Sequence, residues 1–395
     1  MIQSLHSFDL KDKRILIRVD FNVPLDNGRV TDDFRLQASL PTIQHCLQQG
    51  AAVVLMSHLG RPKGKVDEKL SLIPVGETLA DMLEMPIKFS EDCISEDARN
   101  TSLGISPGEI HLLENLRFYD GETLNDPQFA MILAKHGEVF INEAFGTAHR
   151  AHASNVGVVD HFKQTGIGFL MEQELKYLKE SFDHPLRPIT LILGGAKIES
   201  KLSLIRRFLN KADTIIIGGG MSFTFLKAQG REVGGSLINE KMLFTATQIL
   251  NEAKHQKVKL VLPFDFVCAK DAKSQPDAVY SRRELPEDLM GLDIGPKSIE
   301  NFKDIIFSSK TIVWNGPMGV FEQEPYAAGT KAIAEKLVEA TTSGQTTVVG
   351  GGDTAAAIRA YGYHHDVTHV STGGGASLEL LSGETLPAFS ALESK

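Results

Sequence analysis

The sequence is poor in the features that mark secreted, membrane-embedded and nucleic-acid-binding proteins. Only three of its 395 residues are cysteine, and Cys46, Cys93 and Cys268 form no C-x-x-C pair, so we expect no disulfide framework. No uninterrupted apolar stretch approaches the roughly 20 residues that span a bilayer. The first residues do not form the basic and then apolar segments of a secretory signal. We therefore expect a cytoplasmic protein with no membrane partner.

An excess of basic residues and several common motifs are also missing. The chain has 41 Lys and Arg against 50 Asp and Glu, a formal net charge of −9. Nucleic acids require a basic face, so none is expected as a partner. The sequence contains neither G-x-x-x-x-G-K-[ST] nor the protein-kinase signatures. His149 and His152 have helical spacing but belong to no complete zinc motif, so we expect no structural metal.

Short apolar runs rich in β-branched residues are abundant, and helical stretches lie between them. This alternation predicts an α/β protein with two Rossmann-like, doubly wound parallel-sheet lobes. The predicted strands are residues 14–20, 51–56, 138–141, 189–193, 214–217, 259–262, 311–314, 346–349 and 369–370.

One helical pattern separates the two halves of the chain. Met171, Leu175, Leu178 and Phe182 form one stripe, and the pattern stops at His184-Pro185. We interpret residues 171–188 as an interdomain helix and hinge between an N-terminal domain, residues 1–170, and a C-terminal domain, residues 189–385.

In the first half, the predicted strands end in cationic or polar side chains. Ligands of parallel sheets bind beyond the carboxyl ends of the strands. Guanidinium groups bind phosphate and carboxylate bidentately, so several together predict a site for a small molecule with more than one negative group. Asp20 and Asn22 could hold hydroxyl groups, or could belong to an ordinary turn. The candidates are Asp20, Asn22, Arg35, His58, Arg61, Arg117 and Arg150, with Arg18 on the same strand end.

In the second half, the strands end in glycine, as at residues 218–220 and 350–352. Glycines let backbone N–H groups approach phosphate, and a helix N-terminus favours an anion there. Asp353 is either a helix N-cap or a Mg²⁺ ligand, because a carboxylate repels phosphate unless a cation lies between them. Lys197 and Lys201 are four apart and would share one helix face if a helix starts there.

Eight motifs resemble the phosphoglycerate kinase family, and the resemblance runs from about Leu16 to Gly375 in the family's order. They are Arg18-Val-Asp-Phe-Asn-Val-Pro24, Ser57-His-Leu-Gly-Arg-Pro62, Leu113-Glu-Asn-Leu-Arg117, His149-Arg-Ala-His-Ala153, Gly194-Gly-Ala-Lys197, Leu292-Asp-Ile-Gly-Pro296, Trp314-Asn-Gly-Pro-Met-Gly319 and Gly350-Gly-Gly-Asp-Thr354. Two departures stand out: Ser222 replaces a usual Ala, and Ile198-Glu-Ser200 replaces a commoner Val-Ser-Asp.

The resemblance implies a monomeric two-domain enzyme whose C-terminal tail, residues 386–395, packs back on the N-terminal domain. It implies reversible phosphoryl transfer from 1,3-bisphosphoglycerate to Mg-ADP, giving 3-phosphoglycerate and Mg-ATP. The first-half candidates would hold the glycerate ligand, Glu322 the ribose and Asp353 the Mg²⁺. The full nucleotide set would be Lys197, Lys201, Gly219, Gly291, Asn315, Glu322, Gly350, Gly351, Gly352, Asp353 and Thr354.

The reaction needs no general base, because a carboxylate with a pKa near 4 is already ionised at neutral pH. We predict that Arg35 of one lobe and Lys201 of the other clamp the transferring phosphoryl group, assisted by the N–H groups of Gly351 and Gly352, after the lobes close.

Two alternative functions remain. Gly350-x-Gly352-x-x-Ala355 would also suit a nicotinamide-dependent dehydrogenase, although Asp366 and Glu379 are poor candidates for its ribose-binding acid. A non-catalytic nucleotide-binding protein is the other.

Overall fold

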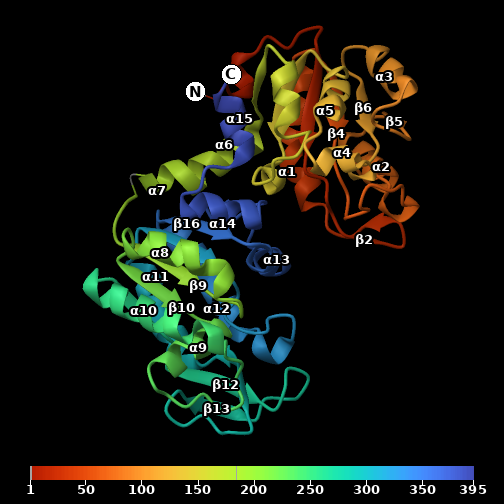
Figure 1. Cartoon of the computed structure of the whole chain (residues 1–395). Helices are drawn as coiled ribbons and strands as arrows, with labels where there is room; N and C mark the ends of the chain where they lie inside the picture. Colours follow the sequence, from red (N-terminus) through yellow and green to blue (C-terminus); the bar gives the residue numbers. More distant parts are fainter. Residues whose placement is uncertain (1, 184) are drawn as a thin grey trace. The chain divides into compact units, whose positions relative to one another are not determined.

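The chain folds into two α/β units, coloured along the sequence in Figure 1. The computed structural model describes residues 2–183 and 185–395. One unit comprises Met1–Lys176 with Thr385–Lys395, and the other Tyr177–Glu384. Each is described below by itself.

The first unit is built on a six-stranded parallel sheet. Its central strand, β1, pairs Ile15 with Val53 on one side and with Val139 on the other. Nearly all side chains of the central strands are buried, as expected when helices cover both faces. In sheet order the strands are β5 (Ile87–Ser90), β6 (Ile110–Leu113), β4 (Ala52–Met56), β1 (Arg14–Val19), β7 (Val139–Glu143) and β8 (Thr165–Ile167).

Helices α3 and α5 of this unit each start after a residue whose side chain accepts a hydrogen bond from one of their first N–H groups. Asp126, for example, accepts a hydrogen bond from Phe129 N at 2.7 Å before α5. The helices are α1 (Phe34–Gln48), α2 (Ile73–Leu83), α3 (Glu96–Leu103), α4 (Asp120–Thr123), α5 (Pro127–Ala134), α6 (Phe169–Leu175) and α15 (Pro387–Glu393), and a small hairpin joins β2 (Leu25–Asp26) to β3 (Arg29–Val30).

The C-terminal helix α15 packs within this first unit. Ala388 N donates to Ala148 O at 3.1 Å, and the rings of Phe145 and Phe389 lie 6.4 Å apart. Leu392 is buried as well.

The start of α6 is held by a buried carboxylate. Glu143 accepts hydrogen bonds from Leu170 N at 3.0 Å and Met171 N at 3.3 Å, and from the hydroxyl of Thr42 at 2.5 Å. These bonds satisfy N–H groups that a helix terminus leaves open. Burial raises the pKa of Glu143 to about 7.

The single helix expected from residue 171 onward is interrupted in the structure. After α6, a π-helical turn covers Lys176–Glu180 and α7 covers Ser181–Asp183. A π-helical turn contains more residues than an α-helical turn, so the side chains after it no longer continue the apolar face of α6. Met171, Leu178 and Phe182 are buried, whereas Leu175 is only half-buried. The predicted stop at His184 lies outside the described residues.

The second unit has its own six-stranded parallel sheet, so the α/β class with two doubly wound parallel sheets is confirmed. In order, its strands are β11 (Lys259–Val261), β10 (Thr214–Ile217), β9 (Ile189–Leu193), β15 (Thr311–Asn315), β16 (Thr346–Gly350) and β17 (His369–Val370). The remaining helices are α8 (Leu202–Leu209), α9 (Met221–Ala228), α10 (Leu243–His255), α11 (Pro296–Ser308), α12 (Ala328–Thr342), α13 (Gly352–Ala360) and α14 (Gly375–Ser382).

A second, antiparallel sheet in this unit was not predicted. It joins β13 (Ala278–Ser281), β12 (Asp265–Ala269) and β14 (Met290–Ile294), with an irregular register between Val267 and Cys268. Its strands carry polar residues and glycine among the apolar ones, so they lack the continuous apolar runs by which the parallel strands were recognised. None of the helices in the described ranges combines the length and hydrophobicity that a membrane crossing requires.

Candidate functional site

A cationic pocket of about 160 Å³ lies at the carboxyl ends of the first sheet. The loops after β1, β4, β6 and β7 supply most of its lining, and the first turn of α1 supplies Arg35. The pocket brings together all seven predicted residues of the anion site. The lining residues are Asp20, Asn22, Arg35, His58, Gly60, Arg61, Arg117, Gly146, Thr147 and Arg150.

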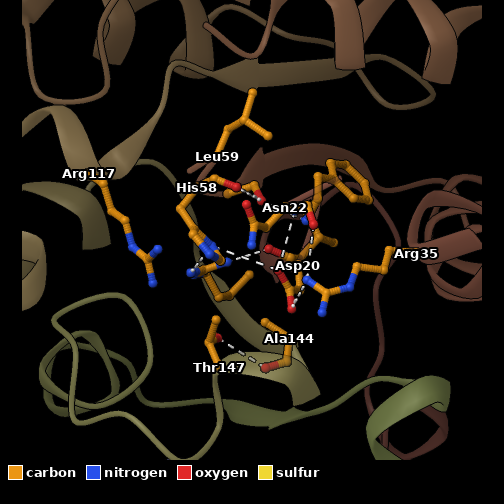
Figure 2. Close-up of polar contacts among 12 residues, drawn as sticks. Asp20, Asn22, Arg35, His58, Leu59, Arg117, Ala144 and Thr147 are labelled. Carbon is orange, nitrogen blue, oxygen red and sulfur yellow. Dashed lines mark hydrogen bonds and ion pairs between the residues drawn. The ribbon is translucent and has the colours of Figure 1, made fainter. Parts of the chain in front are cut away.

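Asp20 and Arg35 face each other in this pocket (Figure 2). Arg35 Nη1 donates to Asp20 Oδ2 at 2.8 Å and to Asn22 O at 3.2 Å. Asn22 Oδ1 in turn accepts from Gly60 N at 2.9 Å, which ties the loop after β1 to the loop after β4. A Cβ at Gly146 would lie 2.1 Å from Asp20 Oδ2, so only glycine lets the loop after β7 approach this carboxylate.

Arg117 lies on the side of His58 that faces away from Arg35 (Figure 2). Its Nη1 donates to Gly60 O at 2.8 Å. Burial, together with the positive charges of Arg18 and Arg150, lowers the pKa of Arg117 to about 10, so the group stays charged at neutral pH. Four guanidinium groups against the single carboxylate of Asp20 make this pocket an anion site.

The structure separates Arg18 from the other arginines. Its side chain is fully buried beneath the pocket and does not line it. His58, by contrast, lines the pocket, and burial followed by the charge of Arg18 lowers the pKa of His58 well below its usual value.

The second unit contains an apolar pocket of about 260 Å³ with a glycine rim. Gly219, Gly291 and Glu322 of the predicted nucleotide set line it. A Cβ at Gly291 would lie 2.3 Å from the Phe223 ring, so glycine is needed for this ring to form a wall. The apolar lining includes Phe223, Leu237, Phe266, Met290, Leu292, Pro317, Met318 and Val320.

A polar cluster at the ends of β15 and β16 contains most of the other predicted nucleotide residues. Lys201 Nζ donates to Asn315 Oδ1, and Gly316 N donates to Thr354 Oγ1 at 2.6 Å. Gly351 has φ +90° and would place a Cβ 3.0 Å from Asn315 Nδ2. Burial lowers the pKa of Lys201 to about 8, against the opposing effect of Asp353.

The structure decides two points that the sequence left open in this cluster. Lys197 and Lys201 do not share an α-helix: Glu199–Lys201 is a 3-10 turn, and α8 begins only at Leu202. Lys197 lies in the preceding loop and lines neither pocket. Asp353 is not the N-cap of α13, because Gly351 occupies that position and Asp353 lies in the first turn.

Sequence reasoning missed the apolar walls and Asp293. In the sequence, Phe223 on α9 and Phe266 on β12 cannot be told from ordinary core residues. Only the fold shows that they border a cavity. Asp293 lies in the Leu292-Asp-Ile-Gly-Pro296 motif, which was a usable signal. It accepts from Gly329 N at 2.7 Å and from Ile294 N at 2.8 Å, and burial raises its pKa to about 7.

The fold and the two pockets define a small-molecule kinase, a phosphotransferase built from two α/β units. The family model for phosphoglycerate kinase matches residues 5–384. The chain therefore belongs to the phosphoglycerate kinase family, and it is a transferase with a kinase role in glycolysis.

Similar proteins cover the whole chain. The phosphoglycerate kinase of Pelodictyon phaeoclathratiforme is 49% identical over 99% of both chains, and that of Thermosynechococcus vestitus is 49% identical over 99% of this chain and 98% of its own. Among solved structures, phosphoglycerate kinase from Coxiella burnetii has a TM-score of 0.89 at 36% identity, covering 100% of this chain and 99% of the other. The enzyme from Pyrococcus horikoshii has a TM-score of 0.84 at 31% identity, covering 100% and 98%. The family assignment removes the dehydrogenase alternative.

Proposed function

We propose that this chain transfers a phosphoryl group reversibly from 1,3-bisphosphoglycerate to Mg-ADP, giving 3-phosphoglycerate and Mg-ATP. The observation that carries the proposal is the presence of two chemically different pockets, one cationic and one apolar with a glycine rim.

The cationic pocket supports glycerate binding. Its guanidinium groups match the phosphate and carboxylate of 3-phosphoglycerate, and Asp20 and Asn22 supply oxygen acceptors for a hydroxyl group. Its volume of about 160 Å³ suits a molecule of this small size.

The second pocket supports nucleotide binding. Phe223, Phe266 and Met290 provide apolar walls for a flat base, and Glu322 provides a carboxylate for ribose hydroxyls. The polar cluster with Lys201, Asn315 and the glycines of the 350–352 segment then serves the phosphates.

The residues present fit Mg²⁺ held jointly with nucleotide phosphates. Asp353 is exposed in the first turn of α13 and offers the hard oxygen ligand that Mg²⁺ prefers. Among the described residues, no three His, Cys, Asp or Glu side chains gather into a metal site made by protein alone. Bound in this way, the ion would neutralise phosphate charge, and Asp353 would orient the nucleotide through it.

Catalysis in this proposal depends on position and charge. The carboxylate or phosphate nucleophile is already ionised, so no side chain has to remove a proton. Arg35 and Lys201 neutralise the equatorial oxygens of the transferring group, and the N–H groups of Gly351 and Gly352 assist. We propose that the units close by bending near residues 171–188, which excludes water from the acyl phosphate. Small-angle scattering without compaction when both ligands are present would contradict closure.

The deciding experiment measures ADP formation from ATP, Mg²⁺ and 3-phosphoglycerate, with coupled removal of the acyl phosphate. Calorimetric titration of each substrate onto the same preparation measures binding separately. Mg²⁺-dependent turnover supports the proposal. Binding of ATP by folded protein without turnover would instead favour a non-catalytic nucleotide-binding protein.

A further inference from the structure

Arg18 is a charged side chain on β1, the central strand of the first sheet. It lies on β1 between Ile17 and Val19, and its exposed fraction is 0%. A buried guanidinium group destabilises the fold unless its charge and its donors are matched. The contacts that match it connect Arg18 to the pocket above.

Each part of the Arg18 guanidinium has an acceptor. Nε donates to Ser154 Oγ at 2.7 Å, and Nη1 donates to the carbonyl of Val19. Nη2 lies 3.2 Å from His58 Nδ1 and 3.8 Å from Glu122 Oε1. His58 is the one of these partners that lines the cationic pocket.

Glu122 supplies the compensating negative charge. It is fully buried on α4 and accepts from Ser154 N at 3.0 Å and from Ser154 Oγ at 2.6 Å. Burial opposes its ionisation, but His152, Arg18 and Ser154 together lower the pKa of Glu122 below its usual value. Arg18 and Glu122 therefore form a buried ion pair with Ser154 bonded to both.

This arrangement decides which nitrogen of His58 carries the hydrogen. Arginine has only donors, so His58 Nδ1 must accept, and the hydrogen of the neutral ring is on Nε2. A protonated ring would point an Nδ1–H at an Arg18 N–H. Asp20 does not accept a hydrogen bond from an Nδ1–H instead, because its Oδ1 is 3.8 Å from His58 Nδ1 and its Oδ2 binds Arg35.

The charges around His58 also disfavour its protonation. Arg18, Arg35, Arg117 and His152 surround the buried ring and lower its pKa, after burial itself as the largest cause. The acidic groups near it, Asp20 and Glu122, are engaged by Arg35, by Ser154 and by Arg18.

We propose that Arg18, anchored by Glu122, is a positioning residue that fixes His58 as a neutral donor with its hydrogen on Nε2. The pocket then offers a ligand oxygen a hydrogen bond from His58 whose charge does not change across the neutral pH range. The assignment of that oxygen to a phosphorylated glycerate rests on the proposed function, whereas the state of His58 does not.

The first test is ¹⁵N NMR of the imidazole nitrogens in the ligand-free, full-length protein from pH 5.5 to 8, with His58→Gln to assign the signals. We expect the pattern of a neutral ring with the hydrogen on Nε2, unchanged over this range. An Nδ1–H pattern, or titration of His58 near pH 6.5, would overturn the proposal. Because no substrate is present, this result does not depend on whether the chain turns over.

The second test removes the buried pair together, in Arg18→Met/Glu122→Gln, so that neither charge is left alone. We expect the His58 ¹⁵N signals to show a mixture of the Nδ1–H and Nε2–H forms, because Arg18 no longer holds Nδ1 as an acceptor. We expect KM for 3-phosphoglycerate to rise at least tenfold, with kcat within threefold. Arg14→Lys is the matched control on β1, since Arg14 Nε donates to His136 O at 3.0 Å, away from the pocket. An unchanged His58 spectrum in the folded double variant would contradict the positioning role. If the variant does not fold, the wild-type spectrum still decides the state of His58.

Discussion

Arg35 and Asp20 form an ion pair inside the cationic pocket, with Nη1 and Oδ2 separated by 2.8 Å. Asp20 follows β1, and Arg35 lies in the first turn of α1, so the pair joins a strand end to a helix start. The carboxylate orients the guanidinium before any ligand binds. This preorganisation is what a group needs if it is to stabilise charge that develops during reaction.

We predict that Arg35→Ala lowers kcat by about 10²–10³, the usual result of removing one preorganised donor, equivalent to roughly 3–4 kcal/mol. The measurement is turnover at saturating ATP and 3-phosphoglycerate. Arg14→Lys serves as the control because Arg14 is remote from the pocket. A mutant that stays within threefold of the wild type would reject Arg35 as a clamp.

Gly146→Ala should weaken glycerate binding without unfolding the unit. The new Cβ would lie 2.1 Å from Asp20 Oδ2, so the carboxylate has to move away from Arg35. We expect KM for 3-phosphoglycerate to rise about tenfold, which corresponds to about 1.4 kcal/mol. Gly104→Ala is the matched control, because Gly104 has φ −91° at the end of α3 and its Cβ would meet only two carbonyl oxygens, at 3.3 and 3.7 Å. Equal KM values for the two variants would show that the Asp20–Arg35 geometry does not matter for binding.

Lys201 should set the alkaline limit of activity. Burial lowers its pKa to about 8, so in the ligand-free enzyme the ammonium group is present below pH 8 and is lost as the pH rises further. We expect kcat/KM for ATP to be level below pH 8 and to fall above it, because kcat/KM reports the free enzyme. In Lys201→Arg the fall should move to higher pH, since guanidinium remains charged. A wild-type profile that stays level to about pH 9.5 would be inconsistent with a role for the Lys201 charge.

Glu143→Gln should change how stability depends on pH. The folded protein keeps the Glu143 proton up to about pH 7, whereas the ordinary value is 4.5, so between these values the folded state binds more protons than the unfolded state. The free energy of unfolding of the wild type therefore falls as the pH rises through this window, by a few kcal/mol from this group. Glutamine does not titrate and lacks this contribution.

Urea unfolding followed by far-ultraviolet circular dichroism at pH 5 and pH 8 measures the effect. The free energy of unfolding of the wild type minus that of Glu143→Gln should be smaller at pH 8 than at pH 5. Comparing the two proteins at each pH cancels the other titrating groups. The same difference at both pH values would mean that Glu143 is ionised in the folded state throughout.

The buried parallel strands were predictable because their information is local. Runs such as Ala52–Met56 and Ile189–Leu193 are almost entirely apolar and are buried at every position, which is typical of strands covered on both faces. The anion-site residues follow from the same logic, since carboxyl ends of parallel strands meet at one edge of a sheet. The antiparallel β12–β14 sheet carries polar and exposed residues, so its short strands have no comparable local signal.

The sequence by itself thus determined the two α/β lobes, the family resemblance and which charged residues gather at the strand ends. Only the tertiary structure decided how those residues are charged and oriented. Arg18 meets Ser154 across 136 residues of sequence, and His58 across 40, so no local pattern could show that Arg18 is buried beneath His58. Burial and long-range partners, which set the pKa and the tautomer of a side chain, are properties of packing.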